Sequence, residues 1–109
     1  MTISDTELIF MGACIAEAIH PDRIILFGSQ ARGDAGPDSD VDLLVIVSRH
    51  FSNAQRWQMM QTIRKAITGV RCSKDILLYH RDEVERWRSS INHVVATALR
   101  EGKVIYEGT

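Results

Sequence analysis

Two aspartates separated by a single residue stand at the start of an apolar segment, in the order Asp40-Val41-Asp42. On a β-strand, residues i and i+2 point to the same face and lie about 6.6 to 6.8 Å apart along the strand. Two carboxylates this close repel each other unless a cation lies between them. Such a pair can bridge two divalent cations about 3.5 to 4 Å apart. The pattern therefore predicts that Asp40 and Asp42 form a metal-binding pair at the start of a strand.

Gly28 and Ser29 follow a second apolar segment, and Asp75 stands near the start of a third. Glycine allows the backbone to approach an anion closely, and a short helix expected from Ser29 would direct N–H groups toward a phosphate. If the third segment runs parallel to the strand of Asp40 and Asp42, Asp75 lies at the same edge of the sheet. Three carboxylates and an N–H-rich turn would serve two-metal phosphoryl or nucleotidyl transfer. The alternative is an ordinary turn beside a solvated strand start.

Periodicity and turn residues divide the chain into helices and strands. Ser4 and Glu7 form a capping box that starts a first helix, and Pro21 follows its end. We expect strands at residues 23–27, 40–47, 74–79 and 103–106. Further helical segments are expected at residues 53–68, 82–88 and 91–100, and a loop at residues 33–39.

The connections between these elements indicate how the sheet is built. Only a loop and a short helix join the first two strands, so these strands can pair antiparallel. The strand–helix–strand unit at residues 40–79 indicates two parallel strands with a right-handed crossover. The strand at 40–47 is apolar on both faces after Asp42, as in a central strand. We therefore expect an α/β (α+β) fold, a small mixed sheet flanked by helices, in one domain over residues 1–109.

The composition is that of an ordinary globular protein, with 109 residues, 45% hydrophobic and 25% charged. A formal net charge of −1 argues against a basic nucleic-acid-binding domain, so we expect no direct nucleic-acid binding. No apolar run approaches the ~20 residues of a membrane span, and residues 1–7 lack the basic start of a signal peptide. These features predict a cytoplasmic protein with no membrane role.

Charge is divided unevenly along the chain. Residues 1–48 carry eight acidic and two basic residues, a net charge of −6, whereas residues 49–109 carry eleven basic and six acidic residues, a net charge of +5. Half of the early acidic residues cluster around the predicted metal site. Many of the later basic residues lie on or beside the helix at 53–68, where they either meet an acidic partner or simply keep the domain soluble: Arg49, Arg56, Arg64, Lys65 and Arg71.

The chain resembles the minimal nucleotidyltransferase (MNT) branch of the DNA polymerase β-like nucleotidyltransferase superfamily. Two runs carry the resemblance: Phe27-Gly28-Ser29-Gln30-Ala31-Arg32-Gly33-Asp34 and Ser39-Asp40-Val41-Asp42-Leu43-Leu44-Val45. The short length fits that branch, and so does the ending Arg100-Glu101-Gly102-Lys103-Val104-Ile105-Tyr106. The resemblance covers essentially the whole chain and implies the family's mixed sheet with flanking helices.

The resemblance also implies roles for individual residues. Gly28 and Ser29 would hold the triphosphate of ATP, and Asp40 and Asp42 would bind two Mg²⁺ ions. Asp75 matches the third carboxylate, which would bind the metal beside the attacking hydroxyl and accept or relay its proton. Many members of the branch are antitoxins paired with a HEPN-domain ribonuclease toxin. The resemblance therefore implies a hetero-oligomer in which AMP is transferred from ATP to a tyrosine of the toxin.

Other functions stay open at this level. A non-catalytic antitoxin would neutralise its toxin by binding alone and would not need the aspartates. A small-molecule nucleotidyltransferase of the aminoglycoside type would need a partner chain or a second copy to build its acceptor site.

Three assignments concern single side-chain types. Arg32 is close enough to contact a triphosphate, or else it pairs with Asp34 or Asp38 to brace the loop. The four histidines show no metal-ligand spacing, so we expect them to be structural or solvated. Trp57 continues the apolar stripe of Ile63, so we expect it to pack against the core; the alternative is that Trp57 or Trp87 is exposed to meet a partner.

Overall fold

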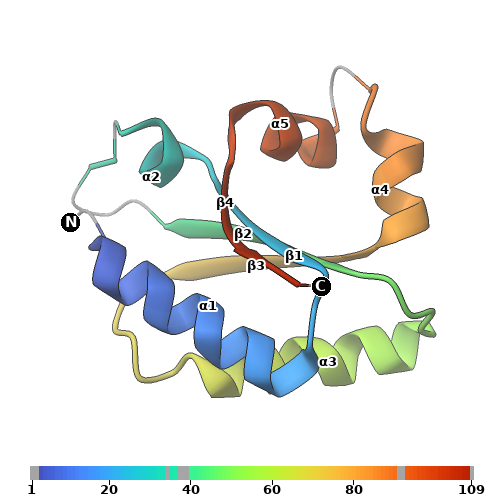
Figure 1. The fold of residues 1–109 in the computed structure, drawn as a ribbon, viewed down its shortest axis with the longest axis horizontal. Helices are drawn as coiled ribbons and strands as arrows, with labels where there is room; N and C mark the ends of the chain where they lie inside the picture. Colours follow the sequence, from blue (N-terminus) through green and yellow to red (C-terminus); the bar gives the residue numbers. More distant parts are fainter. Residues whose placement is uncertain (1–2, 34, 37–39, 91–92, 109) are drawn as a thin grey trace.

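The computed structural model describes residues 3–33, 35–36, 40–90 and 93–108, which form a four-stranded sheet with helices on both faces (Figure 1). The strands are β1 (Arg23–Phe27), β2 (Val41–Val47), β3 (Lys74–His80) and β4 (Lys103–Glu107). The helices are α1 (Asp5–Ile19), α2 (Ser29–Arg32), α3 (Asn53–Ala66), α4 (Arg81–Trp87) and α5 (Val94–Glu101). Within these ranges, no helix combines the length and the apolar character that crossing a bilayer requires.

The sheet is mixed, as predicted, with the strand order β3-β2-β1-β4. β1 pairs antiparallel with both β2 and β4, and β2 pairs parallel with β3. The predicted antiparallel hairpin and parallel crossover are therefore confirmed. The four predicted strands agree with the observed ones to within one residue at each end.

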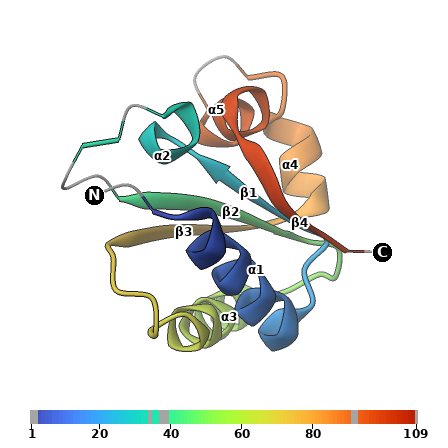
Figure 2. The same ribbon diagram turned by 60° about the vertical axis from the view of Figure 1, so that its left-hand side comes forward.

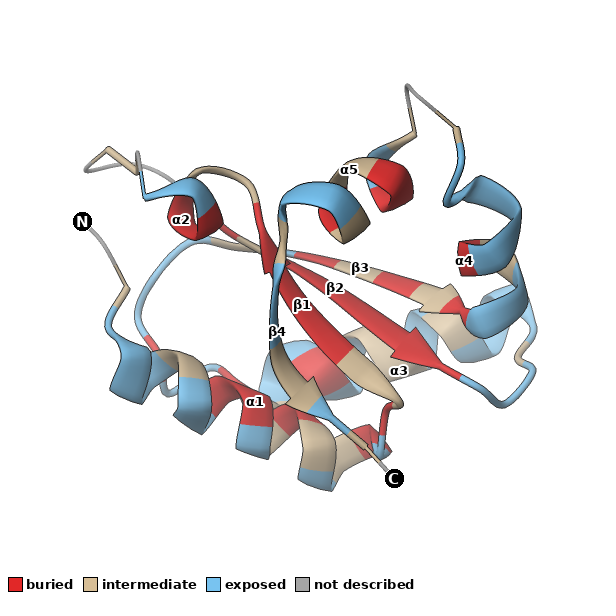
Figure 3. Cartoon of the chain, turned by 45° about the horizontal axis from the view of Figure 1, so that its top comes forward, coloured by how far each residue is buried: buried red, intermediate tan, exposed pale blue. Residues whose placement is uncertain are grey.

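Helices α1 and α3 cover one face of the sheet, and α2, α4 and α5 cover the other (Figures 1 and 2). β2 supplies the centre of both cores because its side chains alternate between the two faces. Leu43 and Val45 join the core beneath α1 and α3, whereas Leu44 and Ile46 join the core beneath α4 and α5. Every residue of β2 except Asp42 is buried (Figure 3). The central strand is therefore held from both sides.

Trp57 does not pack against the core as expected, because its side chain is 66% exposed, which is the alternative that the sequence left open. Ile63 and Ile67 on the same helix are fully buried, and Met60 is half-buried. At about 100° per residue, Trp57 lies about 120° around the helix from Ile63. The part of α3 that packs against the core is therefore narrower than the apolar stripe that its sequence suggests.

Capping residues determine where the later helices begin. The ring of His80 accepts a hydrogen bond from the Asp82 N–H, so α4 starts one residue earlier than predicted. His93 caps α5 in the same way through the Val95 N–H, and the helix begins at Val94. Residues 91 and 92, where the predicted helix began, lie outside the described part of the chain.

Gly102 connects α5 to β4 in a space that has no room for a side chain. A Cβ atom at this position would overlap the Ala98 carbonyl oxygen and Cγ2 of Ile25, and would lie 2.9 Å from the Leu26 carbonyl oxygen. We expect Gly102→Ala to lower the free energy of unfolding by about 1 to 3 kcal/mol, since backbone atoms cannot move aside. Urea denaturation measures this, with Gly69→Ala as the control, because a Cβ there would meet no atom within 4 Å. Equal stability of the two variants would contradict the prediction.

Candidate active site

Three strand ends and one short helix meet at a single edge of the sheet. β1 ends at Phe27 and leads through Gly28 into α2, while β2 and β3 both begin at this edge. In the observed register, Phe27 lies opposite Asp42, and Asp42 lies opposite Asp75. The structure thus brings two of the predicted carboxylates onto neighbouring strands, next to the turn at Gly28.

Asp42 and Asp75 project from the same face of the sheet, because directly paired residues of neighbouring strands share a face. This is the face covered by α2, α4 and α5, since the next inward residue on β2, Leu44, belongs to that core. Asp42 is half-buried, whereas Asp75 and Asp40 are exposed. The candidate site is therefore open to solvent on the side of Asp75 and closed on the side of α2.

The carboxylates form a region of concentrated negative charge. Burial raises the pKa of Asp42, and the nearby carboxylates of Asp75 and Asp40 raise it further, while the Arg32 guanidinium lowers it. A divalent cation would relieve this repulsion, and carboxylate oxygens are the ligands that Mg²⁺ prefers. The three aspartates therefore fit a hard metal ion.

Gly28 provides the close approach between α2 and β2. Its backbone has φ 77° and ψ −159°, and a Cβ atom here would overlap Oδ2 of Asp42. A side chain at this position would be strained by its φ and would also collide with the carboxylate. Ser29 follows as the first residue of α2 and is half-buried. The glycine thus allows the start of α2 to lie directly against the carboxylate cluster.

Arg32 is the last residue of α2, and its guanidinium lies near the carboxylates of Asp42 and Glu101. It lowers the pKa of Asp42, and its Nη1 atom lies 3.8 Å from Oε1 of Glu101 in α5. The sequence suggested Asp34 or Asp38 as its partner, and both lie outside the described residues. Glu101 was not anticipated, because nothing in the sequence indicates that the end of α5 lies beside α2.

Gln30 is a second residue that sequence reasoning missed. Its side chain is buried, and its Oε1 atom accepts a hydrogen bond of 3.2 Å from the Ile3 N–H. The bond attaches the segment before α1 to α2, so Gln30 helps to hold α2 in place. The sequence signal that could have identified Gln30 is its place as a polar residue between Ser29 and Arg32.

Histidines form a compact group at the other end of β3, which the sequence did not indicate. Ligand atoms of His50, His80 and Asp82 all lie within 4.8 Å of one another. Both ring nitrogens of His80 are already used, because Nδ1 accepts the Asp82 N–H and Nε2 lies 2.8 Å from the Ser48 carbonyl oxygen. His50 stacks on His80 with ring centroids 4.0 Å apart. Capping of α4 explains His80 and Asp82, and His50 joins them through its stacked ring.

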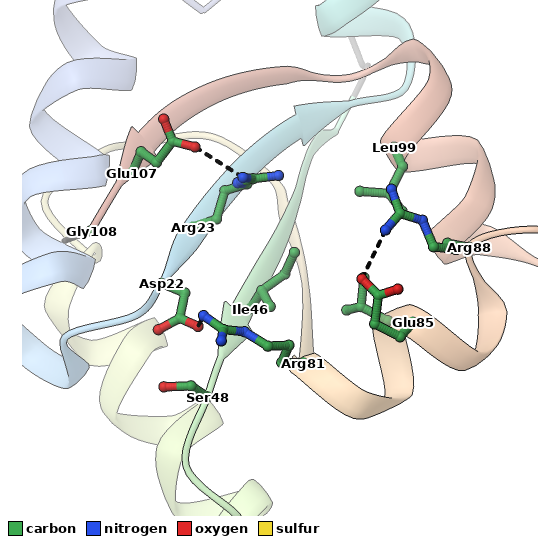
Figure 4. A pocket seen from close by; sticks show the side chains of 11 residues that line it. Asp22, Arg23, Ile46, Ser48, Arg81, Glu85, Arg88, Leu99, Glu107 and Gly108 are labelled. Atoms are coloured by element: carbon green, nitrogen blue, oxygen red, sulfur yellow. Dashed lines mark hydrogen bonds and ion pairs between the residues drawn. The ribbon is translucent and has the colours of Figure 1, made fainter.

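A hollow of about 410 Å³ lies at the end of the sheet opposite to Asp40, Asp42 and Asp75 (Figure 4). Three ion pairs line it: Arg23–Glu107 at 2.9 Å, Arg81–Asp22 at 2.6 Å and Arg88–Glu85 at 2.8 Å. Because each arginine is paired with a carboxylate, the lining offers little net positive charge to a phosphate. The aspartate-rich edge remains the candidate active site.

The chain is similar to a proposed protein adenylyltransferase of Methanocaldococcus jannaschii. The two sequences are 65% identical over 26 residues, which is 24% of this chain and 26% of the relative. The matched segment thus spans about a quarter of that protein's length.

Solved structures with the same fold cover nearly the whole chain. A toxin–antitoxin solved with AMP-PNP is 22% identical, with a TM-score of 0.61 over 98% of this chain and 75% of that one. A proposed nucleotidyltransferase from Sulfolobus solfataricus is 17% identical, with a TM-score of 0.63 over 94% and 79%. At these identities the likeness establishes the fold.

The raised pKa of Asp42 has a consequence for stability. Because the folded state penalises the ionised carboxylate, stability falls as the pH rises through the interval between its ordinary and its raised pKa. We expect Asp42→Asn to stabilise the metal-free protein at pH 7 by up to about 1 kcal/mol, since solvent screens half-exposed charges. Thermal melts at pH 7 and pH 3 test this, with the exposed Glu17→Gln as control. A stabilisation that persists unchanged at pH 3 would refute the electrostatic cause.

The family comparison covers the site and most of the fold. Residues 14–107 match the nucleotidyltransferase domain family. This range includes the turn at Gly28, all of β1 to β3 and the three aspartates. The open carboxylate cluster beside α2 therefore has both the sequence pattern and the fold of that family, and the chain belongs to the nucleotidyltransferase domain family.

Proposed function

We propose that this chain is a Mg²⁺-dependent adenylyltransferase that transfers AMP from ATP to a tyrosine of a HEPN-domain ribonuclease toxin, and thereby acts as its antitoxin. The single observation that carries the proposal is the pairing of Asp42 with Asp75 beside the glycine turn that starts α2. This arrangement supplies carboxylates for metal ions and backbone for phosphate at the same edge.

Family membership and relatives support the same reaction. The chain belongs to the nucleotidyltransferase domain family, and its curated relative is a proposed protein adenylyltransferase. A toxin–antitoxin solved with AMP-PNP, an ATP analogue, shares the fold over nearly the whole chain. A further structure of the same fold, at 20% identity and a TM-score of 0.61, is a variant of the MntA–HpeT toxin–antitoxin. These relatives favour a protein acceptor over a small molecule.

Each residue of the site has a role in this proposal. Gly28 and Ser29 hold the triphosphate, and Arg32 adds positive charge beside it. Asp40, Asp42 and Asp75 would hold two Mg²⁺ ions, which would offset the charge of the phosphates. Asp75 also takes the proton of the tyrosine hydroxyl. The hydroxyl oxygen then bonds to the α-phosphorus while the bond from that phosphorus to diphosphate breaks, and diphosphate leaves.

The exposure of Asp75 favours an acceptor carried by another protein. β3 is an edge strand, and Asp75 is exposed near its start. A tyrosine on a separate scaffold can therefore approach this carboxylate without entering a closed pocket. Asp42, which is half-buried against Gly28, is better placed to hold a metal on the nucleotide side.

The proposed reaction is tested by mixing the chain with ATP, Mg²⁺ and a candidate HEPN-domain protein from the same organism. Mass spectrometry should show AMP on a tyrosine of the HEPN protein. Asp42→Asn should lower the rate at least about a hundred-fold, because the metal loses a charged ligand. The exposed Asp82→Asn, at the opposite end of β3, serves as control and should leave the rate unchanged. Neutralisation of the toxin by Asp42→Asn without any AMP transfer would instead indicate a binding antitoxin.

The two glycines that flank α2 allow a comparison of variants with and without the collision. Gly28→Ala should abolish transfer and weaken ATP binding, because the new Cβ overlaps Asp42 Oδ2. Gly33→Ala has nearly the same positive φ, 82°, but its Cβ would meet no atom within 4 Å. The two sites differ in ψ, −159° at Gly28 and 12° at Gly33, so Gly28→Ala carries more backbone strain in addition to the collision. Similar ATP affinities of the two variants, measured by calorimetry, would rule out the close approach at Gly28 as a requirement.

A further inference from the structure

The outward side of α3 carries an exposed tryptophan among basic residues. Trp57 lies in a hollow of about 540 Å³ together with Arg56, Met60 and Arg64. These positions follow helical spacing, so they form one stripe along the helix. Tryptophan and arginine are the residues most enriched at the energetic centres of protein interfaces. The stripe therefore has the composition of a contact surface.

A second hollow continues this surface toward the candidate active site. It has a volume of about 280 Å³ and lies between the end of α3 and the start of β3, where Ile67, Lys74 and Ile76 line it. Arg64 lines both hollows, so the two are adjacent. We call the lining of both hollows, together with the exposed Lys65 and Arg71 next to it in the sequence, the α3 surface. It ends at Lys74, the residue before Asp75.

The α3 surface lies in the most basic part of the chain. Residues 43–74 contain six basic residues and no acidic one. Three of the six are engaged within the fold: Arg49 with the Ile19 carbonyl, Arg56 with Glu83, and Lys74 with the Val70 carbonyl. Within the described residues, no ion pair joins Arg64, Lys65 or Arg71, and all three are exposed. The helix dipole accounts for basic residues in the last turn of α3, but not for Arg71 or the exposed Trp57.

We propose that the α3 surface is the docking site for the acceptor protein, which presents an acidic patch to Arg64, Lys65 and Arg71 and an apolar side chain to Trp57. This inference rests on the proposed function, because it assumes that the acceptor is a protein. Charge complementarity steers such encounters and fixes their orientation.

The position of the surface suits an acceptor. Lys74 and Asp75 are neighbours on the edge strand β3 and point to opposite faces of the sheet. A partner seated on the α3 surface therefore reaches round one strand to bring its hydroxyl to Asp75. A basic surface can also bind a nucleic acid, and competition with RNA distinguishes the two occupants.

Charge-reversal variants of the full chain test the proposal. Arg64→Glu/Lys65→Glu is compared with Arg86→Glu/Arg88→Glu, because both pairs are exposed basic residues at the end of a helix. Calorimetry at low and high salt measures the affinity for the HEPN-domain protein, with ATP affinity and thermal melting as folding controls. The α3 variant and Trp57→Ala should each bind the HEPN-domain protein about ten-fold more weakly, and the α3 variant should show less salt dependence. The α4 variant should bind like the unmodified chain.

The outcomes separate this inference from the proposed function. Unchanged HEPN-protein affinity in both Arg64→Glu/Lys65→Glu and Trp57→Ala would overturn the docking site, while AMP transfer by the same variants would leave the proposed function standing. Binding that depends on these residues without any AMP transfer would support the docking site and remove the proposed function. Competition by a fluorescent single-stranded RNA, lost in the α3 variant, would assign the surface to RNA and overturn the inference.

Discussion

The carboxyl groups of Asp42 and Asp75 lie side by side because β2 and β3 pair in parallel register, and the rest of the fold must hold this repulsive pair in place. β2 can do so because it is central in the sheet and buried on both faces apart from Asp42. A slip of one residue would turn its apolar side chains to the wrong faces. The packing free energy of two hydrophobic cores thus offsets the repulsion between the carboxylates of Asp42 and Asp75.

Gly28 and Arg32 also help to hold the carboxylate of Asp42 in place, from the side of α2. The missing side chain of Gly28 lets the turn lie against Asp42. Arg32, at the end of the same short helix, lowers the pKa of Asp42, which burial and the neighbouring carboxylates raise. Gln30 attaches the segment before α1 to this helix, and Glu101 links it to α5. A helix of four residues could not hold its position alone, so these contacts from distant parts of the chain decide where it lies.

The uneven charge along the chain has a spatial counterpart. The negative first half places Asp40 and Asp42 at the starting edge of the sheet, where Asp75 adds a third carboxylate. The positive second half includes the basic surface of α3, on the opposite face from the side chain of Asp42. The net charge of −1 therefore combines a negative region around the aspartates with a positive region on α3. Close to the protein, each region acts on its own neighbours, because salt screens charges beyond about 10 Å.

Local patterns in the sequence were sufficient to predict the strands, the mixed sheet and the pairing directions, because alternation, turn residues and connection length act over short distances. The same patterns placed Gly28, Asp40, Asp42 and Asp75 at one edge. Only the tertiary structure revealed that Trp57 is exposed, that Arg32 faces Glu101 and that His50 stacks on His80. These contacts depend on how far each helix turns its side chains toward the sheet and on which segments distant in sequence become neighbours. The periodicity of the sequence predicts which side of α3 is apolar, but only packing decides how much of that side the core covers.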